Sequence, residues 1–277
     1  MTETKEILRG KKIGVVGSGN MGRALILGMK RSGLVSPSDL IASDVDAAQR
    51  KALGDAAHVL TVAKNSILVE ASDVVVLAVK PKDMKRALQE IGSLIKPDRL
   101  VISIAAGITL ETLQKNLDKN PVVRAMPNTP ALVGKGMAAI CAGKRANSSH
   151  MHLARSILGC VGDVVEVPET WMDAVTATSG SGPAYVFYFI EALIEGAIAL
   201  GIGPEIAKKL VIETFVGSLE LLKTSGESPE VLRRRVTSPG GTTEAALRFL
   251  DDREIKKILA GALQAAAKRG KELSNNG

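Results

Sequence analysis

Residues 13–22 read IGVVGSGNMG, and the three glycines among them, Gly17, Gly19 and Gly22, have the spacing G-x-G-x-x-G. The β-branched residues before Gly17 predict a buried strand, and the amphipathic stretch after Asn20 predicts a helix. In such a unit the first glycine allows the turn, the second lets the backbone approach a pyrophosphate, and the third lets the helix pack on the strand. The stretch therefore predicts a dinucleotide site, the alternative being a glycine-rich turn without a ligand.

The composition is typical of a folded globular protein. The chain has 277 residues, 45% of them hydrophobic, so it is long enough for two domains with a large core. No run approaches the roughly 18 consecutive apolar residues of a membrane helix, and the N-terminus is mostly polar, so we expect a soluble, cytoplasmic protein and no membrane partner. The two cysteines, Cys141 and Cys160, stand among apolar or small neighbours, which favours reduced, buried thiols over a disulfide or a metal site.

The net charge of +7 raises the question of nucleic-acid binding. The basic residues are spread along the chain, with one tight cluster at Arg233, Arg234 and Arg235, and aromatic residues make up 3% of the sequence. Because stacking platforms for bases are then scarce, we expect no nucleic acid. The positive charge suits small anionic substrates and phosphorylated cofactors instead.

Residues 1–168 alternate between strand and helix patterns. Several of the strand runs are apolar on both faces, as in the centre of a parallel sheet. This alternation predicts a Rossmann-like α/β dinucleotide-binding domain. Strands are expected at 13–16, 40–43, 59–62, 73–78, 100–104 and before Pro127, with late edge strands at 136–141 and 163–167, and helices at 84–95, 110–117 and 148–158.

Asp44 stands at the end of the second predicted strand, about 20 residues after the glycine motif. An acid at this place hydrogen-bonds the ribose hydroxyls and repels a 2′-phosphate, which favours NADH over NADPH. Two alternatives stay open. Arg50 or Lys51 can swing to a phosphate, and Asp44 can be a simple N-cap of the next helix.

Two loops are expected at the carboxyl edge of the sheet, where doubly wound folds bind ligands. One is the junction Val79–Pro81, which follows the strand 73–78. The other contains Pro127 and Pro130, which prevent a helix from starting between them. A loop held in one shape there can direct Asn128 towards the nicotinamide carboxamide, and a rigid connection without ligand contact is an equally good interpretation.

Residues 169–277 have helical patterns, which predict an all-α second domain. The SGSG at 179–182 predicts a turn, after which Pro183 starts an apolar helix that reaches residue 200. Almost every face of that helix is apolar, and so small a domain has too few apolar faces to cover it. We therefore expect the helix to be buried against a second copy of the chain. Further helices are expected at 205–224, from 244 and at 254–273.

The stretch VTSPGGTT at 236–243 precedes one of these helices. Its Pro-Gly-Gly turn offers exposed backbone amides, and Ser238, Thr242 and Thr243 add hydroxyls at the helix N-terminus. These groups suit an anion such as a carboxylate. A plain helix cap, which needs a single Ser or Thr, is the alternative.

Few side chains are available for acid–base chemistry. Reduction of a ketone or oxidation of an alcohol normally needs a positioned acid or base. The histidines, His58, His150 and His152, lie outside every motif, and VTSPGGTT contains no lysine. A protonated imine already attracts hydride and needs only a hydroxyl to orient its nitrogen, so these residues favour an imine substrate.

Five motifs together resemble pyrroline-5-carboxylate reductase, the last enzyme of proline biosynthesis. They are GSGNMG (17–22), AVKP (78–81), VRAMPNTPA (123–131), SGSGPAY (179–185) and VTSPGGTT (236–243), within a resemblance that runs from residue 13 to about residue 273. The resemblance implies reduction of 1-pyrroline-5-carboxylate to L-proline with NADH or NADPH. It also implies interlocked homodimers through the helical domain, which in many members assemble further into pentamers of dimers, that is, homodecamers.

The resemblance also implies roles for individual residues. Ser238, Gly241 and Thr242 would hold the substrate carboxylate, and Thr243 would be the catalytic residue whose hydroxyl meets the ring nitrogen. No metal is implied. The expected cofactor contacts are Gly17, Ser18, Gly19, Asn20, Met21, Gly22, Ser43, Asp44, Asn65, Ala78, Val79, Lys80, Pro81, Ala105, Ala106, Gly107 and Asn128.

Two other classes of protein compete with this interpretation. The β-hydroxyacid dehydrogenases also join a Rossmann domain to helices, but they resemble one another through a lysine on the long interdomain helix, and residues 183–200 contain none. A regulator that senses the dinucleotide would need a DNA-binding or partner module, for which we find no spare segment.

Overall fold

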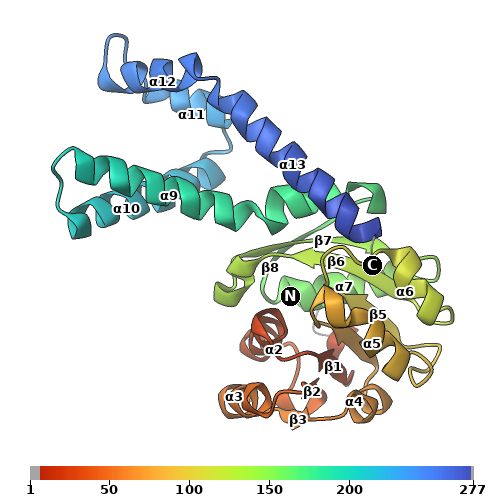
Figure 1. Cartoon of the computed structure of the whole chain (residues 1–277). Coiled ribbons are helices and arrows are strands. Elements are labelled where there is room, and N and C mark those ends of the chain that lie inside the picture. Colours follow the sequence, from red (N-terminus) through yellow and green to blue (C-terminus); the bar gives the residue numbers. More distant parts are fainter. Residues whose placement is uncertain (1–6, 276–277) are drawn as a thin grey trace. The chain divides into compact units, whose positions relative to one another are not determined.

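The computed structural model describes residues 7–275, which form two compact units (Figure 1). The first unit holds the chain up to Ser181 and again from Ala266, and the second is Gly182–Ala265. This division does not coincide with the domain boundary expected after Pro168. The reason is that Met172 is fully buried in the core of the first unit, so the segment after Pro168 stays with that unit.

One sheet of eight strands forms the centre of the first unit. Its order is β3-β2-β1-β4-β5-β6-β7-β8; the first six are parallel to one another, β7 is antiparallel to β6, and β8 is parallel to β7. The strands are β1 (Ile13–Val16), β2 (Leu40–Ser43), β3 (Leu60–Val62), β4 (Val74–Leu77), β5 (Leu100–Ser103), β6 (Val122–Pro127), β7 (Gly136–Ala142) and β8 (Gly162–Glu166). The predicted Rossmann-like sheet is confirmed. The prediction that 136–141 is an edge strand is wrong, because a short connection returns β7 beside β6 and β8 then covers its other side.

Helices cover both faces of this sheet, as expected of a doubly wound fold. All residues of β1, β2, β4 and β5 are buried, so each strand needs apolar partners on both sides. One core cluster contains apolar residues of α2 (Asn20–Ser32), α3 (Ala47–Ala57) and α7 (Ser148–Gly159). The other contains residues of α4 (Asn65–Ala71), α5 (Pro81–Ile91) and α6 (Leu110–Asn116).

The segment after β8 is helical without a break. It consists of η3 (Glu169–Trp171), α8 (Met172–Val175) and the π-helical turn η4 (Thr176–Gly180), and it runs into α9 (Gly182–Ala199). The prediction of a turn at SGSG is therefore wrong. The N–H of Ser181 donates to the carbonyl of Thr176 at 2.8 Å, five residues back, which widens the helix locally. Pro183 has no N–H to donate to the carbonyl four residues before it, so a regular α-helical ladder is not enforced here.

The second unit is entirely helical, which confirms the all-α prediction. It holds α9, α10 (Pro204–Ser225), α11 (Pro229–Arg235), α12 (Thr242–Asp252) and the start of α13 (Ile255–Asn275), of which α11 was not expected. No residue of α9 is buried, and Phe187 and Tyr188 are 64% and 69% exposed. By length and composition alone the helical segment Glu169–Ala199 could also cross a membrane, which for a single helix is weak evidence. An apolar surface of this kind needs a partner.

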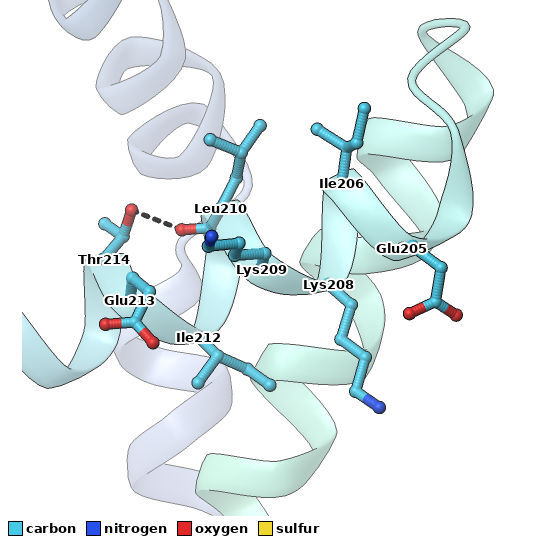
Figure 2. A pocket seen from close by; sticks show the side chains of 8 residues that line it. All are labelled: Glu205, Ile206, Lys208, Lys209, Leu210, Ile212, Glu213 and Thr214. Atoms are coloured by element: carbon cyan, nitrogen blue, oxygen red, sulfur yellow. Dashed lines mark hydrogen bonds between the residues drawn. The ribbon is translucent and has the colours of Figure 1, made fainter.

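An open hollow of about 840 Å³ lies along α10 in the second unit (Figure 2). It is lined by residues between Glu205 and Thr214, and the hydroxyl of Thr214 donates back to the carbonyl of Leu210 at 2.7 Å. Ile206 and Leu210 are 61% and 53% exposed. None of the predicted site residues lines this hollow, and its apolar, one-helix wall suits a protein surface better than a small ligand.

Candidate active site

The glycine motif forms the turn between β1 and α2. Gly17 has a φ of +103°, and a Cβ there would lie 2.8 Å from the carbonyl oxygen of Ala78. A Cβ at Gly22 would lie 2.0 Å from the carbonyl oxygen of Gly17, so the helix and the turn are too close for a side chain. A Cβ at Gly19, the N-cap of α2, would meet no atom within 4 Å. The turn and the close packing are as predicted, and the space beside Gly19 fits a pyrophosphate at the helix N-terminus.

A pocket of about 250 Å³ lies beside this turn. The sequence did not lead us to expect residues of α5 in this site, but α5 adds Lys82, Arg86 and Glu90 to the pocket wall. Their spacing of four residues directly after AVKP places them on one face of a helix, and this is the signal that could have identified them. The predicted cofactor residues that line the pocket are Gly17, Gly19, Ser43, Asp44, Asn65, Ala78, Val79 and Lys80. Those that do not line it are Ser18, Asn20, Met21, Gly22, Pro81, Ala105, Ala106, Gly107 and Asn128.

Asp44 is hydrogen-bonded to the glycine turn. Its Oδ2 accepts the N–H of Ser18 at 2.7 Å, and its Oδ1 accepts the N–H of Asp46 at 2.9 Å. The N-cap of α3 is Asp46, whose side chain accepts the N–H of Ala48. The interpretation of Asp44 as a simple N-cap is therefore wrong, and its carboxylate is held at the pocket wall.

The two basic residues proposed as alternatives for a 2′-phosphate have other partners. Arg50 Nη1 donates to the carbonyls of Asp44 and Val45 at 2.8 and 3.2 Å. Lys51 Nζ lies 2.6 Å from the carboxylate of Asp55, whose hydrogen bond and charge raise the pKa of Lys51. Both cations are thus engaged with acceptors other than the carboxylate of Asp44.

Asn65 is fixed between two elements at the pocket wall. Its Oδ1 accepts the hydroxyl proton of Ser43 at 2.7 Å, and its Nδ2 donates to Glu90 Oε2 at 2.9 Å. The donor on one side and the acceptor on the other set the orientation of the Asn65 amide. The carboxylate of Glu90, on α5, is therefore part of the same polar wall as Asp44.

The loop Ala105–Gly107 follows β5 at the carboxyl edge. Gly107 has a φ of +74°, a conformation that favours glycine, and a Cβ there would lie 3.5 Å from the Cβ of Leu273 in α13. The end of α13 belongs to the first unit, so this contact lies within one compact body.

Asn128 connects three segments of the first unit. Its Oδ1 accepts the N–H of Met137 at 2.8 Å, and its Nδ2 donates to the carbonyl of Ser179 at 3.1 Å. These bonds describe a rigid connection, one of the two interpretations of the loop. The amide keeps one further N–H for a ligand, so a contact with the nicotinamide stays a prediction.

The motif VTSPGGTT forms the loop before α12 in the second unit, with Gly241 as the N-cap. The N–H of Gly240 donates to Glu244 Oε2 at 2.8 Å, and the N–H of Gly241 donates to the carbonyl of Ser238 at 3.0 Å. Two of the amides expected to be exposed are thus bonded within the chain, which corrects the prediction. The groups that remain for an anion are the hydroxyls and the amides of the first helical turn.

Both cysteines are free thiols, as predicted, but Cys141 is buried and Cys160 is only half-buried. Burial raises the pKa of the Cys141 thiol to about 12, with a smaller contribution from the charge of Glu169. Burial also raises the pKa of Cys160. Both are therefore protonated near neutral pH and are poor nucleophiles. Residues 7–275 contain no group of three His, Cys, Asp or Glu side chains that could hold a metal ion.

Two family models match this chain. Residues 169–273 match the pyrroline-5-carboxylate reductase dimerisation family, and residues 12–107 match the family of NADP oxidoreductases described as coenzyme F420-dependent. The pyrroline-5-carboxylate reductase of Synechocystis is 40% identical over 95% of this chain and 98% of its own length. That of Arabidopsis thaliana is 36% identical over 96% of each chain.

Solved structures agree with these relatives. The pyrroline-5-carboxylate reductase of Coxiella burnetii superimposes with a TM-score of 0.90 at 36% identity, covering 95% of this chain and 98% of the other. The Plasmodium falciparum pyrroline carboxylate reductase with NADP bound gives 0.86 at 32% identity, covering 96% and 98%. Because the identity extends over both units, the chain belongs to the pyrroline-5-carboxylate reductase family, as its five motifs predicted.

Proposed function

We propose that this chain catalyses the reaction after which its family is named, the NAD(P)H-dependent reduction of 1-pyrroline-5-carboxylate to L-proline, the final step of proline biosynthesis. The observation that carries the proposal is the identity of 40% to the Synechocystis reductase over nearly the full length of both chains. The test is NAD(P)H oxidation with 1-pyrroline-5-carboxylate, with proline identified as the product. Activity on 3-hydroxy acids with NAD(P), and none on the imine, would favour a β-hydroxyacid dehydrogenase instead.

We propose that the cofactor binds along the carboxyl edge of the sheet. The turn Gly17–Gly22 would hold the pyrophosphate, which is supported by the free space beside Gly19. Ser43, Asp44 and Asn65 would face the adenosine ribose, and Ala78, Val79 and Lys80 would lie along the pocket wall, with Pro81 directly after them. Ala105–Gly107 and Asn128 would contact the nicotinamide half. When bound, the reduced nicotinamide supplies the hydride.

NADH is the proposed preferred cofactor. The carboxylate of Asp44 is held at the pocket wall by two backbone amides, while Arg50 and Lys51 are engaged with other acceptors. An acid at the end of the second strand hydrogen-bonds ribose hydroxyls and disfavours a 2′-phosphate. Lys82 and Arg86 on α5 also line the pocket, but so do Asp83 and Glu90 of the same helix, so α5 adds no net positive charge there.

The substrate would be held by the start of α12. Ser238 and Thr242 would hydrogen-bond its carboxylate, and Gly241, without a side chain, would leave room for it. Thr243 would place its hydroxyl at the ring nitrogen, orient the imine and share a proton with that nitrogen as the C=N bond is reduced. Support comes from the position of these hydroxyls beside the unbonded amides of a helix N-terminus.

The proposed assembly is a homodimer at least, through the second unit. The match to a dimerisation family and the lack of any buried residue on α9 in the single chain both support it. Pentamers of dimers and a cytoplasmic location stay predictions.

A further inference from the structure

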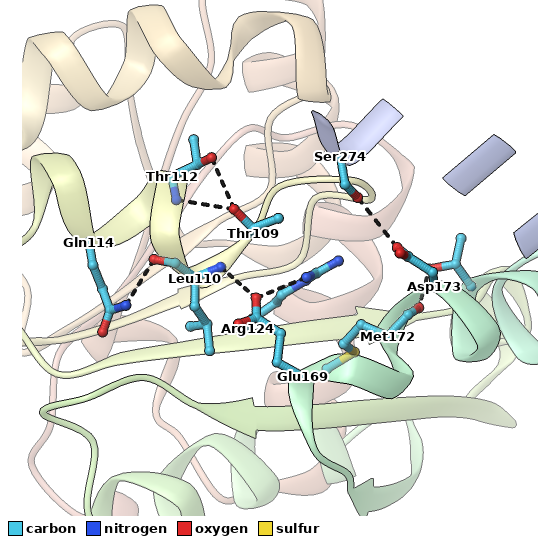
Figure 3. A network of polar contacts seen from close by, with 10 residues as sticks. Thr109, Leu110, Thr112, Gln114, Arg124, Glu169, Met172, Asp173 and Ser274 are labelled. Carbon is cyan, nitrogen blue, oxygen red and sulfur yellow. Dashed lines mark hydrogen bonds and ion pairs between the residues drawn. The ribbon is translucent and has the colours of Figure 1, made fainter. Parts of the chain in front are cut away.

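Glu169 makes an unusual pair of contacts at the start of η3. One oxygen of its carboxylate, Oε1, accepts the N–H of Leu110 at 2.7 Å and a guanidinium N–H of Arg124 at 3.0 Å (Figure 3). Leu110 is the first residue of α6, and Arg124 lies in β6. A single side chain after the last strand of the sheet therefore joins a helix start to a central strand.

Both donors of these contacts belong to buried residues, whereas the side chain of Glu169 is 36% exposed. The side chain of Arg124 is 6% exposed, so its charge depends on the carboxylate of Glu169. The N–H of Leu110 is one of the helix-terminal donors that have no partner within the helix, and Leu110 is itself buried. Hydrogen bonds to an ionised acceptor are stronger than those between neutral groups, so Glu169 restrains the first turn of α6.

The restrained turn is the far end of the loop Ala105–Gly107. Only Ile108 and Thr109 separate this loop from α6, and Thr109 caps the helix by accepting the N–H of Thr112 at 3.1 Å. The near end of the loop is fixed by β5, which pairs with β4 and β6. The position of a loop this short follows the position of both its ends.

A second contact holds the outer side of the same loop. The carboxylate of Asp173, four residues after Glu169, accepts a hydrogen bond of 3.3 Å from the hydroxyl of Ser274 near the end of α13 (Figure 3). The neighbouring residue Leu273 is the one that faces Gly107. The helical segment after β8 thus holds α6 on one side of the loop and the end of α13 on the other.

We infer that Glu169 is a positioning residue for the cofactor: its carboxylate, shared by Leu110 and Arg124, holds the loop Ala105–Gly107 in the shape that receives the nicotinamide half. The inference rests on the proposed contact between this loop and the cofactor. A purely structural ion pair would stabilise the fold without affecting the bound cofactor.

The test compares Glu169→Gln with Glu111→Gln in the full-length protein. Glu111 stands next to Leu110, its side chain is 79% exposed, and it pairs with Lys115 on the surface of α6, so it controls for the loss of one charge. We expect Glu169→Gln to raise the dissociation constant of NADH by about 5-fold or more and to lower kcat, with the KM for the imine less affected. Glu111→Gln should change neither by more than about 1.5-fold.

A second, more conservative variant is needed in case Glu169→Gln does not fold. Glu169→Asp keeps the charge for Arg124 but is one methylene shorter, so it cannot reach both partners, and we expect about a 2- to 3-fold rise in the NADH dissociation constant. Wild-type NADH affinity and kcat in folded Glu169→Gln and Glu169→Asp, whatever their melting temperatures, would overturn the inference.

The variant Gly107→Ala tests separately whether the loop Ala105–Gly107 contacts the cofactor. The substitution strains a residue at positive φ, so it should weaken NADH binding if the loop touches the cofactor. Unchanged binding in Gly107→Ala would remove the proposed loop contact and the inference with it. Weakened binding in Gly107→Ala, together with wild-type binding in both Glu169 variants, would overturn the role of Glu169 but leave the proposed contact between the loop and the cofactor in place.

Discussion

Asn128 donates a 3.1 Å hydrogen bond to the carbonyl oxygen of Ser179, the acceptor that Pro183 cannot serve. In a regular α-helix the N–H of residue 183 would bond to this carbonyl, and proline has none. The side chain of Asn128 replaces the missing donor while its own oxygen accepts the N–H of Met137. Two sequence motifs that are far apart, MPNTP and SGSGP, thus have complementary hydrogen-bonding groups.

Replacement of Asn128 should therefore destabilise the first unit. Asn128→Ala leaves the N–H of Met137 and the carbonyl of Ser179 without this partner, and we expect a loss of about 1–3 kcal/mol in the free energy of unfolding. Asn128→Asp keeps the acceptor but directs an oxygen at a carbonyl, so it should be no better. Urea denaturation of both variants checks the expectation, and wild-type midpoints in both would contradict it.

Cofactor preference should change when Asp44 is replaced. Asp44→Ser removes the carboxylate that would face a 2′-phosphate, and we expect the ratio of kcat/KM for NADPH to that for NADH to rise about tenfold, or about 1.4 kcal/mol. Asp46→Ser is the matched control, because serine preserves the N-cap of α3. An unchanged ratio in Asp44→Ser would mean that the carboxylate only braces the glycine turn.

The hydroxyl of Thr243 should act mainly in the transition state. Thr243→Ala is expected to lower kcat by about 10- to 100-fold, or roughly 1.4–2.7 kcal/mol, with a smaller rise in KM. Thr243→Ser keeps the hydroxyl and should recover most of the rate. Ser238→Ala should act chiefly on the KM for the imine, because a carboxylate contact is present in ground and transition states alike. Steady-state kinetics decides, and full kcat in Thr243→Ala would assign the proton to solvent or substrate.

The protein should never be a stable monomer. No residue of α9 is buried in the single chain, and large apolar side chains such as Phe187 and Tyr188 are exposed, a surface that a soluble monomer rarely tolerates. We expect Phe187→Lys to disrupt the assembly, while Lys115→Glu, on the exposed face of α6, should leave it intact. Light scattering at micromolar concentration measures this, and a folded wild-type species of 29.1 kDa would refute it.

His150 should make stability depend on pH. Its Nδ1 accepts the N–H of Asn147 in a capping box, and burial, followed by the charge of Lys11, lowers the pKa of His150. Because the pKa of the folded state lies below that of the unfolded state, this stabilisation is complete above about pH 6.5 and is lost as the pH falls through the folded-state pKa. His150→Gln keeps a capping acceptor without titrating, so its unfolding midpoint should vary less over this range. Identical pH profiles would exclude a role for His150.

The parallel part of the sheet and the glycine turn could be predicted because local patterns determine them. The strand Ile13–Val16 is buried on both faces, as its apolar composition predicts. The antiparallel β7 was not predictable in the same way, because its direction depends on how the chain turns back after Pro127. A similar limit applied to Glu90, whose place in the pocket depends on the packing of α5 against Asn65.

The helical segment after Pro168 shows a different limit. A glycine-rich SGSG normally indicates a turn, but here a π-helical turn continues the helix, and the carbonyl of Ser179 accepts a donor from Asn128, more than 50 residues earlier. The roles of Glu169 and Asp173 depend in the same way on residues that the sequence places far from them.

At the start of α12, the carboxylate of Glu244 competes with any external anion for a backbone amide. Its carboxylate occupies the amide of Gly240 from four residues away, so it is present at a high effective concentration. Any free carboxylate that seeks this amide must first displace a tethered one. The loop before α12 thus carries its own carboxylate at this amide, and an added anion would compete with it instead of meeting an open donor.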